Sequence, residues 1–132
     1  MRKIVMGFVA ALLIGGAAAT AIAGAKNGPY LVYVSSTYAD GSLADARASS
    51  DWTQYIGCNL AGFQSSMSGY CYANDSAGNF KMCTVPASAA PSMLPVIASL
   101  NSQTYLYFAF DASGNCTTIQ TSTNSYHAPM VP

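Results

Sequence analysis

Short runs of β-branched and aromatic residues, separated by polar turn signals, dominate the chain from residue 29 onward. Runs of this kind are typical of β-strands joined in hairpins. They predict strands at residues 30–34, 52–58, 69–74, 80–85, 104–110 and 115–121. We interpret 37–42 as a turn because it contains an Asp-Gly pair, and the polar, glycine-containing stretch 59–68 as a loop.

A short helix is predicted at residues 43–50. Ser42 stands at the position of a helix cap. Asp45 follows three positions later, in the first turn, where a negative charge is favourable.

A second helix is predicted at about 91–101, because apolar residues there recur at spacings near three and four. Pro95 lacks the N–H that an interior turn needs, so we place the start of this helix near Ser92. The whole pattern predicts an α+β domain: a small antiparallel sheet of hairpins, one crossing helix and the short helix near 43–50.

The N-terminal segment differs from the rest of the chain. It opens with Arg2 and Lys3, continues through an apolar stretch and ends in small residues. This order is typical of a secretory signal peptide, cut after Ala23 or, alternatively, after Ala25. The strongly apolar part is too short to span a bilayer, so we expect cleavage rather than a retained membrane anchor.

Cleavage defines the predicted domain organisation. Residues 1–23 form the signal peptide, and 24–132 form a single domain that is secreted or periplasmic and no longer attached to the membrane. We expect its ordered part to extend from about 29 to 122.

Four cysteines lie in this domain, namely Cys58, Cys71, Cys83 and Cys116. An even number in a small exported domain predicts two disulfides. Structural zinc sites use closely spaced cysteine pairs, and these four are too widely spaced for that.

All four cysteines are expected at one end of the sheet. Successive antiparallel strands return Cys58, Cys71 and Cys83 to the same end. The crossing helix would then make strand 104–110 run parallel to 80–85 and bring Cys116 there. The symmetry of Cys71 and Cys83 about Ala77 favours Cys71–Cys83 with Cys58–Cys116, and the pairing Cys58–Cys71 with Cys83–Cys116 stays open.

One short pattern occurs twice. Residues 72–79 and 108–115 both end in Asp-x-x-Gly-Asn between two predicted strands. A duplicated calcium loop would need more carboxylates than the single Asp of each copy. We therefore interpret both as turns, opened by the Asp side chain and closed by a glycine with positive φ.

Charge excludes several classes of partner. After cleavage the domain keeps three cations, five aspartates and no glutamate. Binding of nucleic acid or anionic lipid needs clustered Lys and Arg, so we expect neither.

Catalytic residues are also not expected. The single histidine, His127, lies in the C-terminal tail, far from a scaffold that could hold a catalytic triad. Metal-ligating residues do not cluster in the sequence, so we expect no metal and no cofactor. Asp40, Asp45 and Asp51 lie close together, and a carboxylate pair can hydrolyse glycosides. We favour roles at helix ends and turns for these three.

Tyrosine is the unusual residue type, and all nine tyrosines lie in the domain. In strand 104–110, Tyr105 and Tyr107 share one face, while Leu106, Phe108 and Phe110 share the other. The second face is the predicted core. Tyr105 and Tyr107 are then a candidate contact surface for a protein or a glycan. The alternative is that tyrosine simply suits a strand with one wet face.

Two stretches carry a resemblance. The first is Trp-Thr-Gln-Tyr-Ile-Gly-Cys at 52–58. The second is a succession of Cys-Tyr-Ala at 71–73, Asp75, Gly-Asn at 78–79, Cys83, Tyr-Leu-Tyr-Phe at 105–108, Asp111, Gly114 and Cys-Thr at 116–117. Over residues 42–121 the chain resembles a group of uncharacterised small secreted bacterial proteins. The resemblance implies bacterial export and two disulfides, and no activity.

These inferences predict a non-catalytic secreted or periplasmic module that binds an unknown partner or builds a structure, self-assembly included. One alternative is a protein inhibitor of an extracellular hydrolase. The other is a small Asp-dependent hydrolase.

Overall fold

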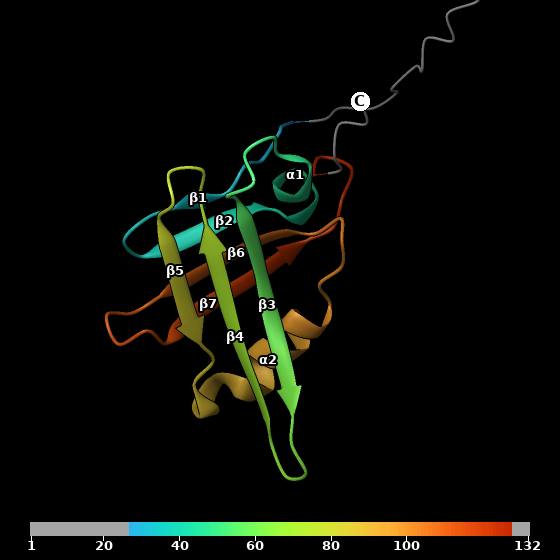
Figure 1. Ribbon diagram of the computed structural model, residues 1–132. Helices are drawn as coiled ribbons and strands as arrows, with labels where there is room; N and C mark the ends of the chain where they lie inside the picture. Colours follow the sequence, from blue (N-terminus) through green and yellow to red (C-terminus); the bar gives the residue numbers. More distant parts are fainter. Residues whose placement is uncertain (1–26, 128–132) are drawn as a thin grey trace, which may run out of the picture.

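Two antiparallel sheets make up the computed structural model, which describes residues 27–127 (Figure 1). The first sheet has the strand order β1-β2-β6-β7. Its strands are β1 (Tyr33–Val34), β2 (Tyr38–Ser42), β6 (Tyr105–Phe110) and β7 (Cys116–Ser122). The second has the order β3-β4-β5, with β3 (Tyr55–Gly62), β4 (Met67–Asn74) and β5 (Phe80–Thr84). The predicted α+β class is confirmed. The predicted signal peptide lies outside the described residues.

The predicted hairpins are divided between the two sheets. β6 pairs with β2 and β7. The expectation that it joins the sheet of β3, β4 and β5 was wrong. Near the cysteines, a parallel β-bridge connects the two sheets, from Thr84 to Asn115. There the Thr84 N–H donates to the Gly114 carbonyl oxygen at 2.9 Å.

The core lies between the sheets, and β6 shows how alternation builds it. Leu106 and Phe108 are fully buried, as predicted. Ala39 of β2 is buried beside them, and the second sheet contributes Ile56 and Ala73.

The short helix α1 (Leu43–Ala48) begins as predicted. The Ser42 side chain accepts a hydrogen bond from the Asp45 N–H at 3.2 Å, which is the geometry of an N-cap. Arg47 lies in the last turn, where a positive charge is favourable.

The second helix, α2 (Ala90–Ala98), follows a turn of 3-10 helix at Ala87–Ala89. Its start lies two residues before the predicted Ser92, so the expectation that Pro95 falls in the first turn was wrong. Pro95 is interior and exposed. The helix loses one backbone hydrogen bond there, and the buried Leu94 and Ile97 hold it against the sheet.

Gly69 of β4 allows α2 to approach closely. A Cβ at this position would lie 2.8 Å from Leu94 Cδ2 and 3.0 Å from Ile97 Cδ1. Any side chain here would require Leu94 and Ile97 to shift from their present positions against the sheet.

Two local interpretations were wrong. The stretch 37–42 is mainly strand β2, because it pairs with β6 from Tyr38 to Ser42. Its Asp-Gly pair serves close packing, since a Cβ on Gly41 would lie 3.1 Å from Val32 Cα. The stretch 59–68 extends the β3–β4 hairpin, and only 63–66 forms a turn.

Two predicted strands are shorter than expected because side chains take over their backbone hydrogen bonds. The Tyr30 N–H donates to Asp45 and the Val32 N–H donates to Gln54, so only Tyr33–Val34 joins a sheet. Asp51 accepts from the N–H groups of Thr53 and Gln54, which delays the start of β3 to Tyr55.

The disulfides are Cys58–Cys71 and Cys83–Cys116, so the favoured pairing of Cys71 with Cys83 was wrong and the open alternative is present. The four cysteines do converge. Cys58 and Cys71 are register partners with Cα atoms 3.9 Å apart. A pair this close is the kind without mutual backbone hydrogen bonds, in which side chains approach most closely.

Candidate functional site

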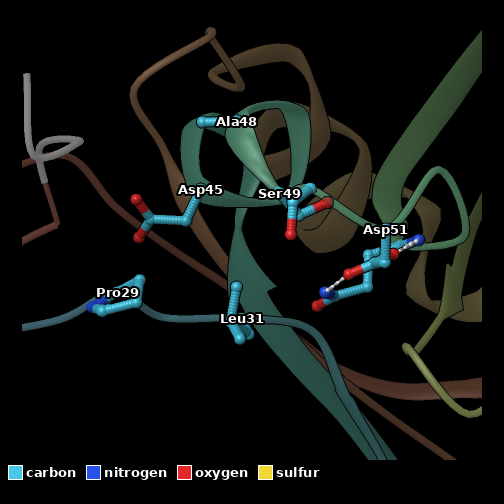
Figure 2. A pocket seen from close by; sticks show the side chains of 8 residues that line it. Pro29, Leu31, Asp45, Ala48, Ser49 and Asp51 are labelled. Carbon is cyan, nitrogen blue, oxygen red and sulfur yellow. Dashed lines mark hydrogen bonds between the residues drawn. The ribbon is translucent and has the colours of Figure 1, made fainter. Parts of the chain in front are cut away.

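A pocket of about 310 Å³ contains two of the three aspartates that the sequence singled out. Figure 2 shows Asp45, from α1, and Asp51, from the loop after α1, on opposite sides of it. Asp40 lies elsewhere, within strand β2, so the favoured role at a helix end or turn was wrong for this residue. The structure therefore brings Asp45 and Asp51 to one pocket and leaves Asp40 outside.

Both pocket carboxylates are already engaged. Asp45 Oδ2 accepts the Tyr30 N–H at 2.8 Å and ties the start of the domain to α1. The oxygens of Asp51 accept from the Gln54 side-chain amide and from the backbone N–H groups of Thr53 and Gln54. These bonds, the Gln54 amide first, lower the pKa of Asp51.

The lowered pKa makes Asp51 poorly suited to act as a general acid. A glycosidase needs one carboxyl whose pKa is raised, so that it can donate a proton to the leaving group. Asp51 has the opposite property. Its role here is that of a local turn, as the sequence analysis favoured.

The repeated Asp-x-x-Gly-Asn pattern forms the same turn twice. Oδ1 of Asp75 accepts from the N–H groups of Ala77 and Asn79, both at 2.9 Å, and Oδ2 accepts from the Asn79 amide. Asp111 repeats these bonds with Ser113 and Asn115. The glycines have φ of 83° and 79°. The predicted turn chemistry is confirmed.

Metal-ligating side chains do not gather in the part of the chain that the structure describes. No group of three or more His, Cys, Asp or Glu residues between 27 and 127 is placed to hold an ion. Within the same residues, no helix has the length and apolar character that a membrane crossing requires.

Tyr105 lies on the outer face of the four-stranded sheet, opposite the core, and is held on three sides. Its hydroxyl donates to Asp40 Oδ2 at 2.5 Å. Its ring stacks on His127 at 4.5 Å and meets the edge of Tyr30 at 5.4 Å. Burial and the bond to Asp40 raise the pKa of Tyr105. Its side chain is therefore committed to internal contacts.

Tyr107 belongs to a separate aromatic group on the same face. Its ring stacks on Tyr38 at 5.4 Å, and Tyr38 contacts Tyr33 at 5.7 Å. Tyr107 is half-buried and Tyr33 is exposed. The two predicted contact residues thus lie on one face and have different surroundings.

His127 packs against the sheet, although the sequence analysis placed it in a loose tail. Its ring lies between Tyr30 and Tyr105, and its carbonyl oxygen accepts from Ser42 Oγ at 3.5 Å. Nδ1 has no hydrogen-bond partner among the described residues. Its ring neighbours in this group are Tyr30 and Tyr105.

A second aromatic face was missed by the sequence analysis. It covers the outer side of the β3-β4-β5 sheet, and we call it the open aromatic face. Its members are Tyr55, Tyr70, Tyr72, Phe80 and Met82. The rings form a continuous series, with centroids 6.0 Å apart from Tyr70 to Tyr72, 5.9 Å from Tyr72 to Tyr55 and 6.5 Å from Tyr55 to Phe80.

The open aromatic face is flat and uncharged. Gly57 lies beside Tyr72, where a Cβ would be 3.6 Å from the Tyr72 hydroxyl, so no side chain rises next to that ring. Asn59 donates to the Tyr70 hydroxyl at 2.7 Å. None of the residues that share this face of β3, β4 and β5 is Asp, Glu, Lys, Arg or His.

The open aromatic face is also exposed. Phe80 and Met82 are about half exposed, at 51% and 50%, and Tyr55 is 46% exposed. In Figure 1 this sheet lies in front of α2 and the four-stranded sheet, and no described element covers its near side. The period-two spacing of Tyr70 with Tyr72 and of Phe80 with Met82 was a signal that sequence reasoning could have used.

No protein-family model, curated protein or solved structure matches the chain significantly.

Proposed function

We propose that this chain is an exported, non-catalytic binding module that contacts a protein partner through the open aromatic face. The observation that carries the proposal is the exposure of Phe80, at the end of a continuous aromatic series, and of Met82 on the same strand. Neither side chain has a polar group, so water is a poor neighbour for both.

The composition of the face favours a protein over a glycan. The buried centres of protein interfaces are enriched in Tyr, Phe and Met and depleted of charge. Tyr55, Phe80 and Met82 fit that description, and the residues sharing their face carry no charge. Tyrosine adds rigid area at little cost in entropy, because it has few rotatable bonds.

Export is part of the proposal. The charged start and apolar stretch of residues 1–23 support a cleaved signal peptide. The two disulfides fit an oxidising compartment. The sequence resemblance adds that the exporting organism is a bacterium, which releases the protein into the periplasm or the medium.

The test places a charge in the face and measures binding. Met82→Lys places a charge in the open aromatic face on the exposed edge strand β5, where lysine is well tolerated. Gln120→Lys is the matched control, an exposed position on the four-stranded sheet. Both variants and the unchanged protein are immobilised and exposed to culture proteins of the producing organism, and captured proteins are quantified by mass spectrometry.

We expect at least one protein to bind the unchanged chain and Gln120→Lys equally. It should bind Met82→Lys at least about tenfold more weakly, as when a charge is placed within an apolar interface. Sedimentation velocity separates a second copy of this chain from other partners. Capture that is equal for all three proteins would refute the proposal. Met82-dependent binding to neutral polysaccharides alone would replace the protein partner with a glycan.

A further inference from the structure

Three cysteines lie side by side on the inner face of the three-stranded sheet. Cys71 of β4 is the register partner of Cys58 on β3 and also of Cys83 on β5. Cys83 is bonded across to Cys116 of β7. We call these four residues the cysteine row. Cys71 therefore stands beside both disulfides while belonging to one.

The backbone hydrogen bonds show that Cys71 and Cys83 could also be joined. The Val85 N–H donates to the Gly69 carbonyl at 2.8 Å, which makes Gly69 and Val85 a hydrogen-bonded pair. Cys71 and Cys83 lie two residues further along the same two strands and form a pair of the same kind. Cα atoms in such a pair are about 5.5 Å apart, inside the range of about 4.4–6.8 Å that a disulfide uses.

Access to the two bonds is unequal. Cys71, Cys83 and Cys116 are at most 2% exposed, and Cys58 is partly exposed. Cys58 is therefore the most accessible of the four residues to a thiol from solution, although its side chain also packs against the core. Attack at Cys58 makes Cys71 the leaving thiolate, next to Cys83.

We propose that the cysteine row is a thiol-triggered relay, in which opening the Cys58–Cys71 bond moves the second disulfide from Cys83–Cys116 to Cys71–Cys83. The trigger is a low-molecular-weight thiol or the dithiol of a protein reductant. The relay goes beyond the proposed binding function and does not depend on it.

The exchange balances in two displacements. The external thiolate attacks Cys58 Sγ, forms a mixed disulfide with it and releases the Cys71 thiolate. The Cys71 thiolate then attacks Cys83 Sγ, forms Cys71–Cys83 and releases the Cys116 thiolate, which takes up a proton. The second displacement consumes no electrons. A second external thiolate attacks the mixed disulfide, releases the Cys58 thiolate and forms the external disulfide. In total, two external thiols are oxidised and the protein loses one disulfide, with Cys58 and Cys116 left as thiols.

The structural consequence is the loss of a crosslink between the sheets. Cys83–Cys116 joins β5 to β7, and Cys71–Cys83 stays within the three-stranded sheet. Reaction of an external thiol at the partly exposed Cys58 thereby removes the Cys83–Cys116 link between the two sheets, although both of those cysteines are buried.

Two single variants test the relay without a reductant. Cys58→Ser leaves Cys71 as a free thiol beside Cys83, and Cys71→Ser leaves Cys58, which is separated from Cys83 by the whole of β4. Each folded variant is incubated at mildly alkaline pH, quenched in acid, unfolded, labelled with N-ethylmaleimide and mapped by peptide mass spectrometry. Circular dichroism confirms the fold before quenching.

In Cys58→Ser we expect the label to be divided between Cys71 and Cys116. In Cys71→Ser we expect it on Cys58 alone. Label confined to Cys71 in the folded Cys58→Ser protein would overturn the relay.

The unchanged protein provides a second test should a variant not fold. Under limiting glutathione, acid-trapped molecules with one remaining protein disulfide should include Cys71–Cys83, with Cys116 labelled. If the one-disulfide species hold only the original pairings, the proposal is wrong.

Discussion

Cys83 of β5 and Cys116 of β7 are joined across the two sheets, with Cα atoms 5.0 Å apart. The bond closes a loop with a sequence separation of 33, whereas Cys58–Cys71 closes one of 13. A crosslink stabilises a fold mainly by restricting the unfolded chain, and a longer loop restricts it more.

We therefore expect Cys83→Ser with Cys116→Ser to lower the free energy of unfolding by about 3–4 kcal/mol, and Cys58→Ser with Cys71→Ser by about 1 kcal/mol less. Urea unfolding of both double variants measures the difference. Equal losses, or a larger loss for the pair within one sheet, would contradict this assignment of the main crosslink.

Gly69 gives a second stability prediction. Gly69→Ala should lower the free energy of unfolding by about 1–3 kcal/mol, because the new Cβ would lie 2.8 Å from Leu94 in α2. Gly62→Ala, in the neighbouring strand, meets nothing within 4 Å and is the control. Its effect should stay within about 0.5 kcal/mol. Denaturant unfolding of both variants decides whether α2 packs as described.

The aspartates of the two repeated turns predict an acid limit to stability. Side-chain and backbone amides lower the pKa of Asp75 and of Asp111 in the folded protein. Their contribution is present above the unfolded pKa, about 3.9, and is lost as the pH falls through the lower folded values. Asp75→Asn with Asp111→Asn should flatten this loss. The free energy of unfolding of the unchanged protein and of the double variant is measured between pH 7 and pH 2. A parallel loss of stability in the two proteins would contradict the prediction.

Tyr105 and Tyr107 should respond differently to truncation. Tyr105→Ser removes a hydrogen bond to Asp40 and two ring contacts, so it should destabilise the domain clearly. Tyr107→Ser removes the stack on Tyr38 and should cost less. Thermal unfolding compares them. A similar loss for both would mean that Tyr105 is no more committed to internal contacts than its neighbour.

The sequence was most informative where the alternation of residues within one strand is enough to predict which face is buried. The alternation of Leu106 and Phe108 with Tyr105 and Tyr107 predicted both the strand and its buried face. Asp40-Gly41 misled because a turn signal describes only local preference. Pairing with β6 and the close approach to Val32 outweighed that preference.

What the sequence could not supply was register. The division of the hairpins between two sheets depends on pairing between strands far apart in the sequence, such as β2 with β6. The residues within one hairpin do not determine that pairing. The choice of Cys58 rather than Cys83 as the partner of Cys71 depends on the alternation of backbone hydrogen bonds. The open aromatic face likewise becomes visible only when Tyr55, Tyr72 and Phe80 are aligned across three strands.

Site-specific photo-crosslinking shows directly whether the open aromatic face touches a protein partner. A benzophenone amino acid replaces Met82 in one protein and Gln120, on the four-stranded sheet, in another. Both proteins are exported by the producing organism and irradiated in its culture. If the open aromatic face contacts a protein, we expect a discrete protein adduct from position 82 and no such adduct from position 120. Adducts of equal yield from both positions, or from position 120 alone, would contradict it.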